Sequence, residues 1–216
     1  MPLRMDLELQ IAVAKVGKYA VSESGDTVEV IERPHGGLSL VMVDGQRSGK
    51  SAKAISNIVS RKAVSLLADG VRDGAAARAA HDYLRTMRGG QVSATLNILS
   101  VDLGTRTIVI TRNSQCPALV VDAGMGETQL LDEPSEAIGI HARTKPVIAE
   151  VPIAPDLYVV LFTDGVLHAG QRYGEELDAT AFVRDHLSSC PGEVCARSLA
   201  DALLVRAVEQ IGRAHV

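Results

Sequence analysis

The sequence predicts an α+β fold in which two antiparallel sheets pack face to face and helices cover their outer faces. Three observations support this prediction: strand-like alternation occurs in hairpin pairs, helical periodicity occurs in two separate blocks, and the blocks follow one another in a fixed order. That order is strands, a helix pair, a strand meander and a second helix pair. It differs from the regular strand–helix alternation that produces a doubly wound parallel sheet.

The predicted strands are rich in Val, Ile, Leu and Thr and are bounded by turn residues. In chain order they are residues 8–16, 28–32, 38–43, 93–101, 107–111, 118–122, 147–151 and 157–163. The second and third are joined by Pro34-His35-Gly36-Gly37, and the fourth and fifth by Asp102-Leu103-Gly104-Thr105. Each of these two pairs therefore predicts a β-hairpin, and hairpins pair neighbouring strands antiparallel.

Apolar residues at helical spacing predict two helix pairs. The first pair comprises residues 51–68 and 75–88, and Gly89-Gly90 ends it because glycine readily adopts the left-handed conformation that terminates helices. The second pair lies between residue 180 and about residue 211, with a break at Pro191-Gly192.

The bulk composition predicts one soluble domain. A chain of 216 residues without a visible linker favours a single domain over residues 1–216. A net charge of -4 without a basic stripe argues against a nucleic-acid partner. The acidic start argues against a signal peptide. The lack of an apolar run of about 18 residues argues against a membrane span. We therefore expect a cytoplasmic protein.

Residues 38–51 predict a buried strand, an Asp-Gly corner, a glycine-rich loop and the start of a helix. One chemistry that fits this corner is a nucleotide triphosphatase using the Gly45–Ser51 loop, which nearly spells the phosphate-binding motif Gly-x-x-x-x-Gly-Lys-Ser/Thr. Residues 157–164 imitate the acid-terminated strand that accompanies such loops. The loop is nevertheless one residue short, and the surrounding hairpins lack the parallel sheet that a phosphate-binding loop requires.

The other chemistry is a metal site made by three aspartates at strand ends. Asp26 follows Gly25 just ahead of a strand, and Asp44 and Asp164 each end an apolar strand and precede a glycine. Acids in these positions can meet at one edge of a two-sheet sandwich, and carboxylate oxygens are the ligands that Mg²⁺ and Mn²⁺ prefer. Each Asp-Gly alone is a common turn dipeptide. The three together are harder to explain as turns.

The order of these motifs along nearly the whole chain resembles a known family, the metal-dependent protein phosphatases of the protein phosphatase 2C (PPM) type, in the bacterial branch similar to the sporulation phosphatase SpoIIE. The motifs that carry the resemblance are Ser24-Gly25-Asp26, Val43-Asp44-Gly45, Ser93-Ala94-Thr95-Leu96, Ala137-Ile138-Gly139 and Phe162-Thr163-Asp164-Gly165-Val166. Each motif is weakly specific, whereas the ordered set is strongly specific.

The resemblance implies a four-layer α-β-β-α sandwich, flanked by helix pairs, with two Mn²⁺ or Mg²⁺ ions at one end of the sheets. Carried over, Asp44 would bridge both metals, Asp26 and the carbonyl of Gly45 would complete one site, and Asp164 would bind the other metal. The implied reaction is hydrolysis of phosphoserine or phosphothreonine by a metal-activated water, without a covalent phosphoenzyme. The implied partner is a phosphorylated protein substrate, such as an anti-sigma-factor antagonist.

The chain departs from the family pattern near its C-terminus. The family has one more metal-binding aspartate, in an Asp-Asp or Asn-Asp pair before a last strand, and residues 209–216 contain no such pair. We therefore expect the metal held by Asp164 to be weakly bound, absent or completed by another group. The departure also motivates an alternative function, a catalytically silent phosphatase-like module that binds a partner. An uncovered sheet edge would favour a homodimer.

Overall fold

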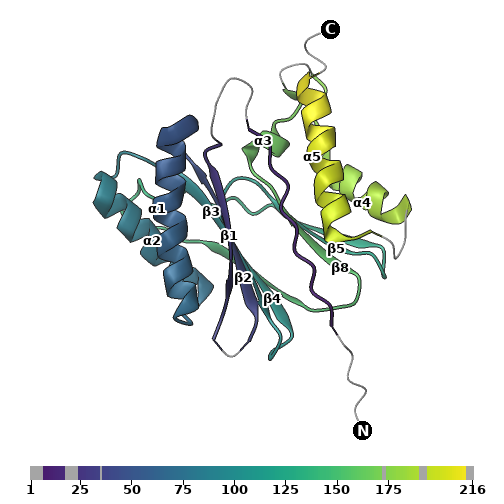
Figure 1. The fold of residues 1–216 in the computed structure, drawn as a ribbon, viewed down its shortest axis with the longest axis horizontal. Helices are drawn as coiled ribbons and strands as arrows, with labels where there is room; N and C mark the ends of the chain where they lie inside the picture. The colour runs from purple at the N-terminus through teal and green to yellow at the C-terminus, as the bar shows by residue number, and fades with distance from the viewer. Residues whose placement is uncertain (1–6, 18–23, 35, 172–173, 190–193, 213–216) are drawn as a thin grey trace. The chain divides into compact units, whose positions relative to one another are not determined.

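The structure is a computed structural model that describes residues 7–17, 24–34, 36–171, 174–189 and 194–212 (Figure 1). The chain divides into two compact units. Unit 1 comprises residues 1–15, 118–130 and 154–216, and unit 2 comprises residues 16–117 and 131–153. Each unit has its own sheet and its own helices. Within the described residues, no helix combines the length and the apolar character needed to cross a membrane.

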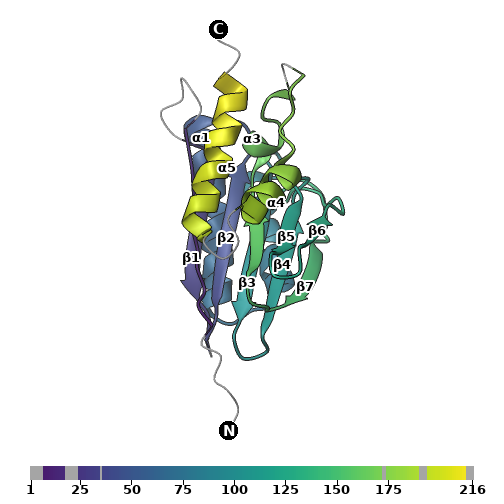
Figure 2. The ribbon, with the colours of Figure 1, turned by 90° about the vertical axis from the view of Figure 1, so that its right-hand side faces the viewer.

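Unit 2 contains a five-stranded antiparallel sheet in the order β1-β2-β3-β4-β7 (Figure 2). The strands are β1 (Asp26–Glu32), β2 (Leu38–Gly45), β3 (Ala94–Asp102), β4 (Thr107–Asn113) and β7 (Val147–Pro152). Both predicted hairpins are confirmed, since β1 pairs with β2 and β3 pairs with β4. The central position of β2, between β1 and β3, places the Asp-Gly corner inside the sheet.

Two helices of unit 2, α1 (Gly49–Ala68) and α2 (Asp73–Arg88), cover one face of this sheet. Their apolar faces join the inward residues of β2 and β3 in one core cluster, which includes Val41, Val43, Ile55, Val59, Leu67, Leu84, Leu96 and Ile98. Each large aliphatic side chain buried in this way contributes about 1.5–3 kcal/mol. Gly89 has a φ of 58° and ends α2, as the sequence predicted.

In its described residues, unit 1 contains a three-stranded sheet in the order β6-β5-β8 and three helices (Figures 1 and 2). The strands are β5 (Ala118–Asp122), β6 (Glu127–Leu131) and β8 (Leu157–Leu161), and the helices are α3 (Asp164–Leu167), α4 (Ala179–Ser189) and α5 (Ala196–Gly212). Strands β5 and β8 pair antiparallel, and α4 packs against α5. The second predicted helix pair is therefore confirmed, while its predicted break at Pro191-Gly192 falls outside the described residues.

Three details differ from the sequence-based expectations. The predicted strand over residues 8–16 is wrong, because residues 7–17 have no strand pairing; they are held instead by the start of α5, where the Ala196 N–H donates to Gln10 Oε1 at 3.1 Å. Strand β6 was not predicted, because its sequence ETQLL has one β-branched residue and lies mostly exposed. The predicted strand 157–163 ends at Leu161, and α3 begins at Asp164.

Candidate metal centre

Two of the three predicted aspartates lie side by side in unit 2. Asp26 is the first residue of β1, Asp44 is the next-to-last residue of β2, and the two are directly opposite each other in the antiparallel register. Directly opposed residues project from the same face with Cβ atoms about 4.5–5.5 Å apart. Both side chains are half-buried. The carboxylates are therefore close enough to share one cation.

These aspartates belong to a polar row on one face of the sheet. Thr95 of β3 is the register partner of Asp44 on its other side. The residues adjacent in sequence, such as Val43 and Leu96, point to the opposite face and are buried in the core beneath α1 and α2. The row of Asp26, Asp44 and Thr95 therefore lies on the sheet face that those helices do not cover.

Gly45 and Gly25 allow the backbone at this site to approach α1 closely. A Cβ added at Gly45 would lie 2.1 Å from the carbonyl oxygen of Ala52, and one added at Gly25 would lie 2.7 Å from the Ala52 Cβ. No larger residue fits either position without moving α1. A Cβ added at Gly25 would also lie 3.7 Å from the Gly45 carbonyl oxygen. This oxygen is therefore close to Gly25, the residue that precedes Asp26.

A hydrogen-bond network fixes the start of β1 against α1. The Lys53 ammonium donates to the carbonyl of Asp26 and to Thr27 Oγ1, both at 2.8 Å. The Thr27 hydroxyl donates in turn to Asn57 Oδ1 at 3.0 Å, and the Asp26 N–H donates to Ser24 Oγ at 3.3 Å. These bonds orient the backbone that carries the Asp26 carboxylate. Lys53 belongs to no motif by which it could have been identified before the structure was known.

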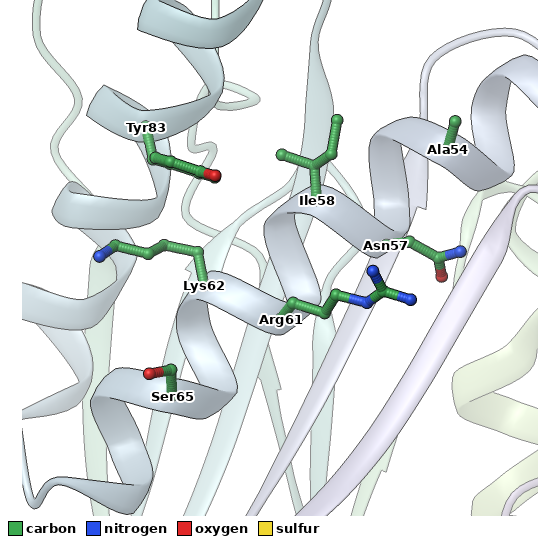
Figure 3. A pocket seen from close by; sticks show the side chains of 7 residues that line it. All are labelled: Ala54, Asn57, Ile58, Arg61, Lys62, Ser65 and Tyr83. Atoms are coloured by element: carbon green, nitrogen blue, oxygen red, sulfur yellow. The ribbon is translucent and has the colours of Figure 1, made fainter.

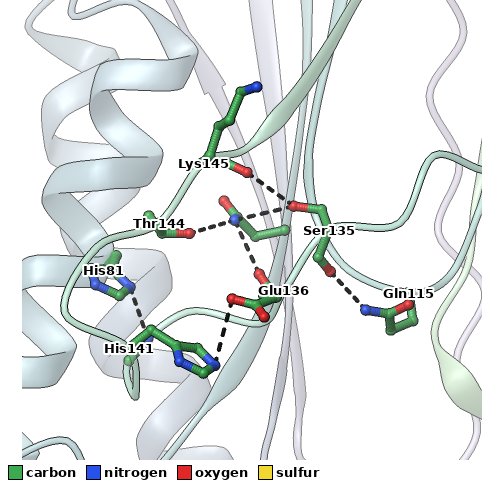
Figure 4. Close-up of polar contacts among 9 residues, drawn as sticks. His81, Gln115, Ser135, Glu136, His141, Thr144 and Lys145 are labelled. Atoms are coloured by element: carbon green, nitrogen blue, oxygen red, sulfur yellow. Dashed lines mark hydrogen bonds and ion pairs between the residues drawn. The ribbon is translucent and has the colours of Figure 1, made fainter.

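The motif Ala137-Ile138-Gly139 lies at the same edge of unit 2. Ile138 forms an antiparallel bridge with Ala94, and Ala94 is the register partner of Gly45. The Gly139 N–H donates to Nδ1 of His81 on α2 at 3.1 Å, and His81 is 1% exposed (Figure 4). Burial lowers the pKa of His81, so the ring is neutral and its Nδ1 can accept this bond.

The rest of this loop is tied to the end of β4. Asn113 Nδ2 donates to Thr144 Oγ1 at 2.8 Å and to the carbonyl of Glu136 at 3.1 Å. The buried guanidinium of Arg112 donates to the carbonyls of Cys116 and Glu133 at 2.8 and 2.7 Å. Figure 4 shows the loop residues Ser135, Glu136, Thr144 and Lys145 close together. The network positions the segment that borders Gly45.

Asp164 is described in unit 1. It is the first residue of α3, directly after β8, and its exposed side chain follows the N-cap residue Thr163. Its carbonyl accepts a hydrogen bond from the His168 N–H at 2.9 Å. Since Asp26 and Asp44 belong to unit 2, the meeting of all three acids stays a prediction. Within the described parts of the chain, no three His, Cys, Asp or Glu side chains form a group that could hold a metal ion.

The donor set in unit 2 fits a hard divalent cation. Two neighbouring carboxylates and a backbone carbonyl beside them are all oxygen ligands, the type that Mg²⁺ and Mn²⁺ select. No thiol or imidazole belongs to this set, so it does not match the ligands typical of zinc.

The phosphate-binding loop hypothesis does not fit the structure. Strand β2 lies between two antiparallel neighbours, whereas the phosphate-binding loop follows a strand of a parallel sheet. The Gln46 N–H donates to the Ser93 carbonyl at 3.0 Å, so it does not contribute to a phosphate nest. Lys50 and Ser51 are exposed residues in the first turn of α1.

Comparisons with known proteins agree with this architecture. The family model described as Stage II sporulation protein E (SpoIIE) matches residues 34–214. A search of curated proteins found no match.

Three solved structures are similar in fold. The PP2C phosphatase domain of Bacillus subtilis SpoIIE, with a fragment of its regulatory domain, has a TM-score of 0.74 at 17% identity, covering 92% of this chain and 57% of that chain. The SiaA PP2C domain of Pseudomonas aeruginosa has a TM-score of 0.70 at 23% identity, covering 88% and 75%. RsbX in complex with magnesium has a TM-score of 0.68 at 15% identity, covering 91% and 86%.

These likenesses show a PP2C-like α+β fold with two antiparallel sheets and flanking helices. This chain spans 57% of the length of the B. subtilis chain that it matches. The family model, by contrast, matches most of this chain. The chain therefore belongs to the SpoIIE family, as a phosphatase domain of the PP2C (PPM) type in the bacterial SpoIIE, RsbX and RsbU-like branch.

Proposed function

We propose that this chain is a Mn²⁺- or Mg²⁺-dependent serine/threonine protein phosphatase. The observation that carries the proposal is the directly opposed pair of Asp26 and Asp44, with Gly45 beside it, in a member of the SpoIIE family. The magnesium in the RsbX structure supports a hard divalent cation. The oxygen-only donor set in unit 2 supports the same choice.

The proposed ligand roles are those that the family resemblance implies. Asp44 would bridge two cations, Asp26 and the Gly45 carbonyl would complete one position, and Asp164 would supply the other. This assignment requires one domain over residues 1–216, arranged as the four-layer α-β-β-α sandwich that the family resemblance implies. When bound, divalent cations in such a site lower the pKa of water and neutralise charge that develops on phosphoryl oxygens.

The residues of unit 2 contribute orientation. The Lys53 ammonium donates a hydrogen bond to the Asp26 carbonyl, so its charge is directed at the backbone. This bond fixes the start of β1, the strand that carries the Asp26 carboxylate. Ala52 contacts both glycines and sets the distance between α1 and the end of β2. Preorganised ligands of this kind need little rearrangement when a cation or a phosphoryl group arrives.

Family membership supports a phosphorylated regulatory protein as the substrate, of the kind represented by anti-sigma-factor antagonists. The substrate phosphate would meet a polar row that ends in Thr95, whose side chain shares the face of the two aspartates. We expect the phosphoserine or phosphothreonine side chain to reach the site, since serine and threonine are the phosphorylated residues that the PPM resemblance implies.

The test compares hydrolysis of a phosphoserine peptide by the natural chain and by Asp44→Asn, each with Mn²⁺ and with Mg²⁺. Loss of a ligand that provides several kcal/mol of charge stabilisation should lower the rate by about 100-fold or more. Asp69→Asn is the matched control, because Asp69 is an exposed acid whose described hydrogen bonds involve its backbone N–H. Equal activity of Asp44→Asn and Asp69→Asn would refute the metal assignment.

A second candidate is a catalytically silent phosphatase-like module that binds a partner. It is motivated by the departure from the family pattern at residues 209–216, which contain no Asp-Asp or Asn-Asp pair. Titration calorimetry with Mn²⁺ separates the two functions. Metal binding at micromolar to millimolar concentration, lost in Asp44→Asn, supports the phosphatase; no binding together with no turnover supports the silent module.

A further inference from the structure

Helices α1 and α2 carry a net positive charge, whereas the whole chain is acidic. Residues 49–88 contain eight Lys or Arg and three Asp, a net charge of +5, so the rest of the chain carries -9 to give the total of -4. Helix α1 alone has four Lys or Arg and no Asp or Glu. The whole-chain charge of -4 therefore conceals a basic helix pair in an acidic protein.

A groove of about 540 Å³ opens between the outer surfaces of these two helices (Figure 3). Its lining includes Asn57, Ile58, Arg61 and Lys62 of α1 and Tyr83 of α2, and it contains no carboxylate. The buried face of α1 is formed by other residues, among them Ile55, Val59 and Ala63, which pack toward the sheet. Of the groove residues, Ile58 also packs against the core, whereas Asn57, Arg61, Lys62 and Tyr83 do not belong to the core cluster.

The cations in this groove lack an acidic partner. No described carboxylate forms an ion pair with Arg61 or Lys62. The Lys62 ammonium lies 5.6 Å from the centre of the Tyr83 ring, a cation–π contact. Tyr83 is 41% exposed, and Met87, one helical turn further along α2, is 56% exposed. The exposed Arg61 and the half-buried Lys62 thus share the groove with the exposed Tyr83 ring.

We infer that the groove between α1 and α2 binds an acidic segment of a partner protein, with apolar side chains between its carboxylates. Carboxylates would pair with Arg61 and Lys62, and an apolar side chain would pack on Ile58 and Tyr83. Tyrosine and arginine are the residue types that most often dominate protein–protein binding energy. The charge of -9 on the rest of the chain would repel an acidic segment elsewhere and so direct it to this groove.

A protein segment fits the groove better than a nucleic acid or a membrane does. A nucleic acid is held mainly by several cations along its phosphates, whereas the groove lining offers two, Arg61 and Lys62. The concave, partly apolar lining accepts a few side chains, while a lipid surface or a polyanion needs a broad, convex or extended basic face. The inference concerns binding alone and does not depend on phosphatase activity.

The test is fluorescence anisotropy with a labelled helical peptide of about 15 residues that carries Glu and Leu at i, i+3 and i+4 spacing. A second peptide has Gln in place of every Glu. We expect saturable binding of the Glu peptide, at least tenfold weaker binding of the Gln peptide, and at least a tenfold loss of affinity in the double variant Arg61→Glu/Lys62→Glu. Tyr83→Ala should weaken binding severalfold through the lost apolar contact.

The matched control is Arg143→Glu/Arg184→Glu, which makes the same charge change at exposed positions outside the groove. It should change the affinity less than twofold, and circular dichroism should show that both double variants keep the helix content. An equal loss of affinity in both double variants would overturn the inference, because it would show general attraction only. Tighter binding of a thymidine oligonucleotide, or of phosphatidylglycerol vesicles, than of the Glu peptide would also overturn it.

Discussion

The close approach of α1 to the end of β2 makes Gly45→Ala a sharp test of the candidate site. The added Cβ would lie 2.1 Å from the Ala52 carbonyl oxygen and 2.8 Å from its carbonyl carbon, and both are backbone atoms that no rotamer change can move. Overpacking of this kind costs about 1–3 kcal/mol. Since 1 kcal/mol shifts the melting temperature of a 150–250-residue protein by roughly 2–4 °C, a decrease of about 2–12 °C is expected in a calorimetric scan.

Gly165→Ala is the matched control, because Gly165 follows Asp164 just as Gly45 follows Asp44. Nothing lies within 4 Å of a Cβ added at Gly165, which sits in helix α3. Alanine there should leave the melting temperature unchanged or raise it slightly, since alanine is the better helix former. The Gly45 substitution should also weaken Mn²⁺ binding, measured by calorimetry, through displacement of the Asp44 strand end. Equal melting temperatures for the two variants would refute the packing argument.

Three further substitutions test the framework around the site. Arg112→Met should lower the free energy of unfolding in urea by about 2–4 kcal/mol, because two backbone carbonyls lose charge-assisted hydrogen bonds; a loss within error of zero would show that these bonds contribute nothing net. Arg33→Met should cost about 3–5 kcal/mol by leaving Asp73 buried without its ion pair, and Arg33→Met with Asp73→Leu should recover most of that loss in the same titration. Burial lowers the pKa of His81 below 6.5, so the stability that its neutral ring provides is complete above about pH 6.5 and is lost as the pH falls through the folded-state pKa. His81→Gln should flatten the dependence of unfolding free energy on pH between 7.5 and about 5, and an unchanged slope would exclude His81 as its source.

The pairing of Asp26 with Asp44 could be predicted from the sequence because one turn fixes the register. Glu32 and Leu38 are opposed on either side of the predicted turn, and counting outward residue by residue reaches Asp26 opposite Asp44. Antiparallel strands without a bulge keep this register along their length. Both acids were therefore identifiable as neighbours on one face once the hairpin had been recognised.

Other features depend on tertiary contacts that a local pattern does not contain. The role of Lys53 arises only when α1 packs beside β1, and the bond between His81 and Gly139 joins residues that are 58 positions apart. The strand predicted over residues 8–16 was wrong for a different reason. Their alternation satisfies the strand pattern, but alternation describes an extended chain and does not supply the neighbouring strand that a ladder needs. The sequence therefore predicted the extended form without its actual partner, the start of α5.

Helix α1 connects the two binding properties that we propose, because its faces are chemically separate. Its first turns hold Ala52 against Gly45 and direct Lys53 to the Asp26 carbonyl. Its outward face carries Arg61 and Lys62, more than one turn further along, with no described hydrogen bond to either aspartate. Charge reversal in the groove should consequently leave the metal ligands in place, whereas an enlarged residue 52 would displace the start of the helix. Partner binding and metal binding can therefore be changed independently by mutation, although one helix supports both.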